Sequence, residues 1–134
     1  MREYRGRCIG DDDVYGWIEG YYVRLKDIWK NREIHRIYNG FAEYDCGEFY
    51  GDYYEVDPET VGRPTGVSDK NGNIIFEGDI VKRHASPMLV KWDDESASFI
   101  TCYYFHDKYY ENTLDGHKNL EIIGNIHDNP ELLG

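Results

Sequence analysis

The stretch of sequence that decides the fold reads Thr65-Gly66-Val67-Ser68-Asp69-Lys70-Asn71-Gly72-Asn73-Ile74-Ile75-Phe76-Glu77-Gly78-Asp79-Ile80-Val81. Within it, Asn71-Gly72 tolerates positive φ at both central positions of a two-residue turn, which predicts a type I′ hairpin between the flanking strands. A second tight turn is predicted at Glu77-Gly78-Asp79, where the glycine supplies the unusual backbone angles before a new apolar run. The stretch therefore predicts short β-strands joined by tight turns.

The rest of the chain continues this pattern in both directions. Abundant Tyr and Gly, with scattered Ile and Val, favour pleated strands and turns over helices. Strands are predicted over residues 4–9, 17–25, 34–38, 52–56, 80–83, 88–92, 97–105 and 120–126. A helical turn over 27–32 is a local alternative, and Asn129-Pro130-Glu131 is typical of a helix start.

Short strands at this spacing predict a mostly β fold. We expect a small, open β-barrel or sandwich of short antiparallel strands with a short C-terminal helical turn. A length of 134 residues fits one domain. We therefore expect a single domain over residues 1–134, in which N-terminal strands within 1–60 pack on a barrel-like part spanning 61–134.

Charge and cysteine content narrow the classes of function. The chain has 26 acidic and 15 basic side chains, and the net charge of −11 opposes non-specific binding to nucleic-acid phosphates. Cys8, Cys46 and Cys102 lie far apart without a CxxC pair, so neither a disulfide framework nor a zinc knuckle is predicted. The polar N-terminus holds no apolar signal core or membrane span, so we expect a cytoplasmic protein with no membrane partner.

Three blocks of sequence, in order, resemble the YopX family of phage and prophage proteins. The first is Arg5-Gly6-Arg7 with Tyr15-Gly16-Trp17 and Gly20-Tyr21-Tyr22. The second is Val56-Asp57-Pro58-Glu59-Thr60-Val61-Gly62, continuing through Thr65-Gly66, Asp69-Lys70-Asn71-Gly72 and Phe76-Glu77-Gly78-Asp79-Ile80-Val81. The third is Glu121-Ile122-Ile123-Gly124-Asn125-Ile126 with Asn129-Pro130-Glu131-Leu132-Leu133.

The chain departs from the pattern of that family at Arg63-Pro64, where glutamine and an aromatic residue are more usual. The resemblance implies a phage or prophage origin, a predominantly β fold and expression inside a bacterial host. It implies no established activity, and it assigns no catalytic residues.

No cofactor or metal site is predicted. Asp69-Lys70-Asn71-Gly72-Asn73 looks like the start of a calcium loop, but Gly falls at loop position four and Ile80 at twelve, whereas an EF-hand needs Gly at six and Glu at twelve. Asp11-Asp12-Asp13 is better explained as a solvated turn than as a cation site. The histidines form no HExxH or HxH pair, so zinc is not expected.

Catalytic motifs are also absent from the sequence, which contains no nucleophile elbow, phosphate loop or dinucleotide fingerprint. We therefore do not expect an enzyme. The best catalytic alternative is a hydrolase that uses Glu77 and Asp79 with His84 or His106 as general acid and base. The competing interpretation is structural, because carboxylates beside a turn glycine most often accept hydrogen bonds from nearby backbone N–H groups.

The segment 37–62 interleaves carboxylates with aromatic side chains and contains no Lys or Arg. Such a surface suits a basic host or phage protein, and carboxylates along an extended segment could imitate the phosphates of DNA. The alternative is that this segment is solvent-exposed and that its tyrosines cover the wall of the barrel. The residues predicted to bind a partner are Glu43, Tyr44, Asp45, Glu48, Tyr50, Asp52, Tyr53 and Tyr54.

Two classes of function remain. We favour a non-catalytic interaction protein that acts by self-association or through a host or phage partner, and we expect a homo-oligomer, because edges of short strands readily pair between subunits. The alternative is a nucleic-acid or small-ligand binder, because aromatic rings beside cations stack on bases. Its contact surface would combine Trp29 with Arg24, Lys26, Lys30, Arg32 and Arg36. The net charge and the nearby Asp27 and Glu33 oppose this alternative, and the same cations are natural partners for the acidic segment that follows.

Overall fold

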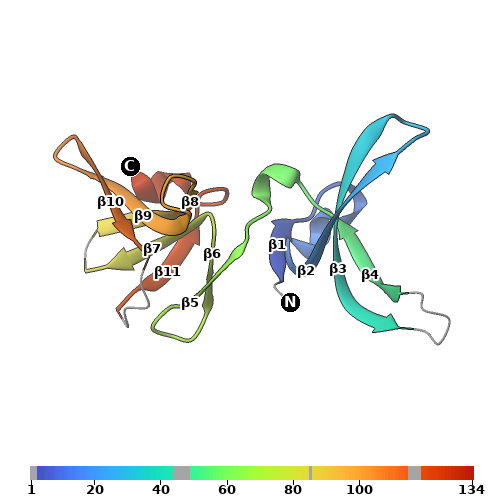
Figure 1. The fold of residues 1–134 in the computed structure, drawn as a ribbon, viewed down its shortest axis with the longest axis horizontal. Helices are drawn as coiled ribbons and strands as arrows, with labels where there is room; N and C mark the ends of the chain where they lie inside the picture. Colours follow the sequence, from blue (N-terminus) through green and yellow to red (C-terminus); the bar gives the residue numbers. More distant parts are fainter. Residues whose placement is uncertain (1–2, 44–48, 85, 115–118) are drawn as a thin grey trace. The chain divides into compact units, whose positions relative to one another are not determined.

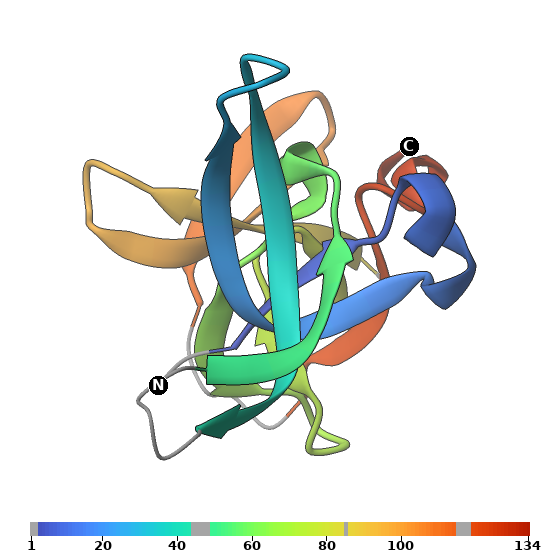
Figure 2. The same ribbon diagram turned by 90° about the vertical axis from the view of Figure 1, so that its right-hand side faces the viewer.

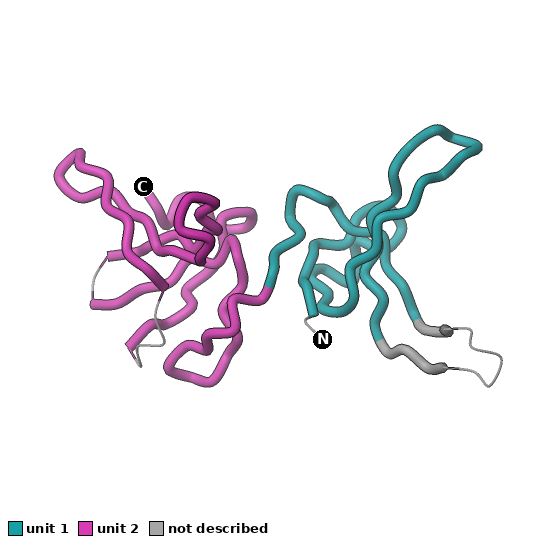
Figure 3. Tube along the Cα trace, viewed as in Figure 1, with its two compact units in different colours: residues 1–63 teal, residues 64–134 magenta. Residues whose placement is uncertain are grey.

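The computed structural model describes residues 3–43, 49–84, 86–114 and 119–134, with the backbone alone for 40–43 and 49–51. The fold is mostly antiparallel β, as predicted, and short 3₁₀ helices are the only helical elements of the described ranges. No sheet formed by these residues closes into a barrel, which agrees with the open form expected. The chain divides into two compact units, Met1–Arg63 and Pro64–Gly134 (Figure 3).

Unit 1 is built on one four-stranded antiparallel sheet in the order β1-β2-β3-β4, with β3 between β2 and β4 (Figures 1 and 2). A tight turn joins β2 to β3, so the alternative of a helical turn over 27–32 is wrong. Both strands also continue beyond their predicted ends, into a long hairpin. The elements are β1 (Tyr4–Arg7), η1 (Gly10–Tyr15), β2 (Trp17–Asp27), β3 (Arg32–Glu43), β4 (Phe49–Glu55) and η2 (Pro58–Thr60).

The segment after β4 returns to β1 and covers a small core. Isolated bridges join Arg5 to Gly62 and Cys8 to Val56. Cys8, Ile37 and Val56 are buried together beneath partly buried aromatic rings. These isolated bridges do not add another strand to the sheet beside β1. Unit 1 is therefore an open sheet whose C-terminal segment crosses back to β1.

Unit 2 combines the hairpin β5-β6 with a five-stranded antiparallel sheet in the order β10-β9-β8-β7-β11 (Figure 1). Its core is a cluster of buried apolar side chains from β6, β7, β8 and the segment between β10 and β11. The sequence pattern does not predict β10. The elements are β5 (Pro64–Ser68), β6 (Ile74–Phe76), β7 (Asp79–Arg83), β8 (Ser86–Asp93), β9 (Ser98–Phe105), β10 (Lys108–Thr113), β11 (Glu121–Asn125) and η3 (Pro130–Leu133).

The turn between β5 and β6 differs from the predicted type I′ form. Gly72 has a φ of 84°, but Asn71 is not among the described residues with positive φ. The turn is longer: Gly72 N donates to Asp69 O at 3.0 Å, and Asp69 N donates to Asn73 O at 2.8 Å. The Asp69 side chain accepts from the backbone N–H groups of Asn71 and Asn73, both at 2.9 Å, and this stabilises the longer loop.

The close approach of β2 and β3 explains why position 20 in unit 1 is a glycine. A Cβ on Gly20 would collide with the carbonyl oxygen of Tyr38 and would lie 2.9 Å from Ile37 Cγ2. Neither group can move without shifting the ladder or the core.

We therefore expect Gly20→Ala to lower the free energy of unfolding by about 1–3 kcal/mol, the usual cost of overpacking. The matched control is Glu19→Ala, which changes the exposed neighbouring position on the same strand. Urea denaturation followed by circular dichroism measures both. Equal stability of the two variants would contradict the close packing at Gly20.

Candidate interaction surfaces

The described part of the predicted acidic surface does not form one face. Tyr44, Asp45 and Glu48 lie outside the described residues, and Glu43 and Tyr50 are described by their backbone alone, so these positions stay predictions.

The remaining predicted residues lie on β4, where side chains alternate between the two sides of the sheet. Tyr54 packs on the buried core of unit 1. Tyr53 is half exposed, and the Arg36 guanidinium lies 4.2 Å from the centre of its ring. Asp52 is exposed, opposite Asn39 in the ladder. Of these three, Tyr54 therefore serves packing, whereas Tyr53 and Asp52 are accessible.

The predicted cations divide into two groups. Arg32 Nη1 lies 3.3 Å from Glu55 Oε1, and Arg36 contacts Tyr53, so both of these side chains interact with β4. Arg24, Lys26 and Lys30 are exposed, and none of them forms an ion pair within the described ranges. The second group is therefore available to a negatively charged partner.

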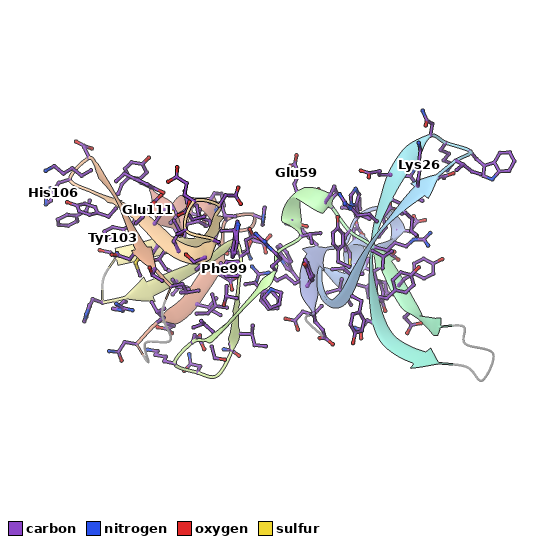
Figure 4. All side chains as sticks on the ribbon, in the orientation of Figure 1. Lys26, Glu59, Phe99, Tyr103, His106 and Glu111 are labelled. Atoms are coloured by element: carbon purple, nitrogen blue, oxygen red, sulfur yellow. The ribbon has the colours of Figure 1, made fainter. Side chains whose placement is uncertain are left out.

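These exposed cations surround the end of the β2-β3 hairpin, where Figure 4 labels Lys26. The Asp27 carboxylate accepts from Trp29 N at 3.0 Å and from Lys30 N at 3.2 Å, which fixes the turn. Ile28 and Trp29 are 76% and 93% exposed. An ordered turn thus presents two apolar side chains to solvent.

Strand β10 is an open edge of the sheet in unit 2. Just beyond it, Leu114 N donates to Phe99 O at 3.0 Å. Hydrogen-bonded and non-hydrogen-bonded pairs alternate along an antiparallel ladder, so the N–H groups that point away from β9 are those of Tyr109, Glu111 and Thr113. No side chain of the described ranges accepts from them. All six residues of β10 are exposed.

Aromatic rings line both faces of this hairpin, on which Figure 4 labels Tyr103, His106 and Glu111. Tyr110 stacks on Tyr103 on one face, and Tyr109 contacts Tyr104 on the other. The Tyr109 hydroxyl donates to Glu111 Oε1 at 2.8 Å. Lys91 beside the hydroxyl lowers the pKa of Tyr109, but burial and hydrogen bonding to Cys102 and Glu111 raise it to about 12. Tyr109 therefore stays a neutral donor at physiological pH.

The opposite edge of the same sheet, β11, is covered. Asp69 Oδ2 accepts from Ile122 N at 3.2 Å, and Asn129 Oδ1 accepts from Asn125 N at 3.3 Å. The backbone of Lys70 also donates to Leu120 O at 2.8 Å. Asn129 precedes η3, as predicted, but its side chain caps no helical N–H group and instead covers β11. The two edges therefore differ in their capacity to accept another strand.

The residues of the hydrolase alternative do not meet. Asp79 is 1% exposed, and its Oδ2 accepts from Phe76 N at 2.8 Å across the Glu77-Gly78 turn, where Gly78 has a φ of 93°. His84 follows the other end of β7, roughly 16 Å away along the strand. His106 lies in the turn between β9 and β10. The geometry of Asp79 is that of a turn-stabilising carboxylate.

Metal-binding geometry is likewise missing where the structure describes side chains, because no three His, Cys, Asp or Glu residues gather there. Asp12, within the predicted solvated turn, accepts from Glu55 N at 3.1 Å. No helix of the described ranges is long and apolar enough to cross a membrane.

Comparison with known proteins identifies the family. The family model described as YopX protein matches residues 17–134, which span both units apart from the first strand and η1. The chain belongs to the YopX family. A similar solved structure is the crystal structure of protein EF1440 from Enterococcus faecalis, with 26% sequence identity, a TM-score of 0.50, and coverage of 100% of this chain and 99% of that chain. No curated protein sequence matches the chain.

The hydrogen bonds of Asp69 favour its ionised form in this YopX-family chain. Burial acts to raise the pKa of Asp69, but hydrogen bonds from the backbones of Asn73, Ile122 and Asn71 hold it below its usual value. A carboxyl group with a lowered folded-state pKa stabilises the fold above its unfolded-state pKa, and this contribution disappears as pH falls through the folded-state pKa.

We therefore expect Asp69→Asn to lower the free energy of unfolding by about 2 kcal/mol at pH 7, with a difference from wild type that shrinks towards pH 3. Chemical denaturation at several pH values measures this difference. Glu95→Gln, an exposed acid of the same unit, is the control. A difference that stays constant with pH would contradict the role of the ionised carboxylate.

Proposed function

We propose that the chain is a non-catalytic interaction protein that self-assembles by pairing the β10 strands of two copies. The observation that supports this proposal is the contrast between the two edges of one sheet. Side chains cover the backbone of β11, whereas β10, whose six residues are all exposed, presents outward N–H groups that no side chain of the described ranges satisfies. An exposed edge strand is a template for another strand.

Charge selects a register for this pairing. Residues directly opposite each other in an antiparallel ladder point to the same face of the sheet. Two β10 strands related by a two-fold axis must therefore be centred on one residue and not between two residues. Centring on Tyr110 places Tyr109 opposite Glu111 of the second copy. Moving the centre to Glu111 sets two carboxylates opposite each other, and moving it to Tyr109 sets Asp107 opposite Glu111; both arrangements are unfavourable. The Tyr110-centred pair is therefore the arrangement we propose.

A matched pair of variants tests this assembly. Glu111→Pro removes an outward N–H group that the β10-β9 ladder does not use, so the monomer should keep its fold. Glu111→Ala removes the same side chain but keeps the N–H group. In sedimentation over a range of concentrations, we expect wild type and Glu111→Ala to form dimers and Glu111→Pro to stay monomeric. A monomeric wild type, or a dimeric Glu111→Pro variant with native circular dichroism, would overturn the proposal.

The β2-β3 hairpin supports a second candidate function, the binding of single-stranded nucleic acid. Trp29 offers an uncovered ring on a fixed turn, with exposed cations behind it. Such a ring can stack on a base while the cations contact phosphates. Because charges are screened beyond roughly 8–10 Å at physiological salt, the local cations can act despite the net charge of −11.

Fluorescence anisotropy with a mixed-sequence single-stranded oligonucleotide tests this candidate. Trp29→Ala should weaken binding by roughly five- to hundredfold, as expected for a lost stacking contact, and added salt should weaken it further. Val14→Ala, which shortens an exposed apolar side chain of η1, should leave it unchanged. Absence of binding at low salt, or equal effects of the two variants, would exclude the hairpin as a nucleic-acid site.

A further inference from the structure

One face of strands β8, β9 and β10 carries several side chains with acid–base or nucleophilic groups. The free thiol of Cys102 lies opposite Leu89 on β8 and opposite Glu111 on β10. Opposite residues point to the same face of a sheet, and so does every second residue along a strand. Lys91 and Tyr109 each stand two positions along the strand from one of these partners, so both share the face of Cys102.

The Lys91 side chain crosses β9 beside this thiol. Its Nζ lies 3.7 Å from Glu111 Oε1 and 5.4 Å from the centre of the Tyr109 ring. Neighbouring strands lie about 4.8 Å apart, so a side chain that reaches from β8 to β10 must pass over β9. It passes beside Cys102, because Cys102 is the direct partner of Glu111 in the ladder. The Tyr109 hydroxyl, which donates to Glu111, also hydrogen-bonds to Cys102.

A small oxidant can reach this thiol, and no second thiol of unit 2 competes for the product. Cys102 is 7% exposed, but the Lys91 side chain beside it is 43% exposed, and exposed side chains change rotamer within nanoseconds. Cys102 is also the only cysteine in the sequence of unit 2. The sheet therefore places an amine, and not another thiol, next to the sulfur.

We propose that Cys102 is a peroxide-sensitive site whose oxidised sulfur forms a covalent bond with the amine of Lys91. The thiol proton passes to solvent, and the thiolate attacks one oxygen of hydrogen peroxide. The O–O bond breaks, the sulfur loses two electrons to become a sulfenic acid, and the Lys91 ammonium gives a proton to the leaving hydroxide, which departs as water. The neutral amine then attacks the sulfur. The S–O bond breaks, its hydroxyl group leaves with an amine proton as water, and a sulfenamide bond remains.

This bond changes the sheet next to its open edge. It joins β8 to β9 covalently, and it removes the ammonium charge of Lys91, so Glu111 loses its ion pair. The reaction takes place within one chain and uses side chains on a face of the sheet. The assembly proposed above uses the outer backbone of β10, so the two proposals stand or fail separately.

Mass spectrometry of the full chain, treated in its native state with dilute hydrogen peroxide, tests the proposal. We expect a product lighter than the untreated chain by two hydrogen atoms, about 2 Da, whereas sulfinic and sulfonic acids add oxygen. Trypsin should no longer cut after Lys91, so one peptide spanning residues 84–108 should carry this loss of mass. Dithiothreitol should restore both the mass and the cleavage.

Two variants with the same change of side chain test the role of the amine. Lys91→Arg keeps the cation but has no primary amine, so it should abolish the loss of mass and leave Cys102 to form a sulfinic acid. Lys82→Arg, on β7, should keep the bond.

The peptide map of the wild type decides the question even if a variant fails to fold. Sulfinic acid at Cys102 with normal cleavage after Lys91 would overturn the proposal. So would a disulfide between Cys102 and Cys8 or Cys46, or a native wild-type thiol that does not react with the peroxide.

Discussion

The carboxylate of Asp69 joins the turn between β5 and β6 to the edge strand β11 in unit 2. One oxygen accepts from Asn71 N and Asn73 N and so holds the turn between β5 and β6. The other accepts from Ile122 N and so attaches that turn to the outer edge of β11. The side chain is only 6% exposed, and a buried charge is tolerated because its oxygens accept several hydrogen bonds. The register of the hairpin and the closure of the sheet edge therefore depend on the same group.

Closing one edge leaves the other as the place where the sheet can grow. On β11, side chains and a neighbouring backbone take the bonds that a further strand would need. On β10, the outward backbone and the aromatic faces remain exposed. In the proposed assembly, this asymmetry directs association to one strand without any special sequence motif.

Much of this fold could be predicted from the sequence, because its signals are local. Alternation over residues 17–25 identified β2, apolar runs over 88–92 and 97–105 identified β8 and β9, and the Glu77-Gly78-Asp79 turn leads into β7 as expected. Strand β10 was missed because all of its side chains are exposed and no alternation marks it, although Tyr109 and Tyr110 favour strands. The prediction of a type I′ turn was wrong because it rested on Asn71-Gly72 alone. The side chain of Asp69 accepts hydrogen bonds that stabilise a longer loop.

The candidate sites were less accessible to sequence analysis. Trp29 and the cations near it could be listed from the sequence because they are close together in it, but the contacts of Arg32 and Arg36 with β4 could not. An open groove in unit 2 is lined by residues from Arg83 to Asn112, and only the pairing of β7 to β10 brings these residues together. The division of predicted tyrosines between packing and exposure depends on the side of β4 to which each one points, as Tyr53 and Tyr54 illustrate.

Amide hydrogen exchange of the wild-type protein, followed residue by residue at increasing protein concentration, tests the contrast between the two edges most directly. We expect Ile122 N–H on β11 to exchange slowly at every concentration, since Asp69 holds it within one chain. The outward N–H groups of Tyr109, Glu111 and Thr113 should exchange quickly in dilute solution and become protected as copies pair. Exchange on β10 that does not change with concentration, or fast exchange at Ile122, would contradict the account.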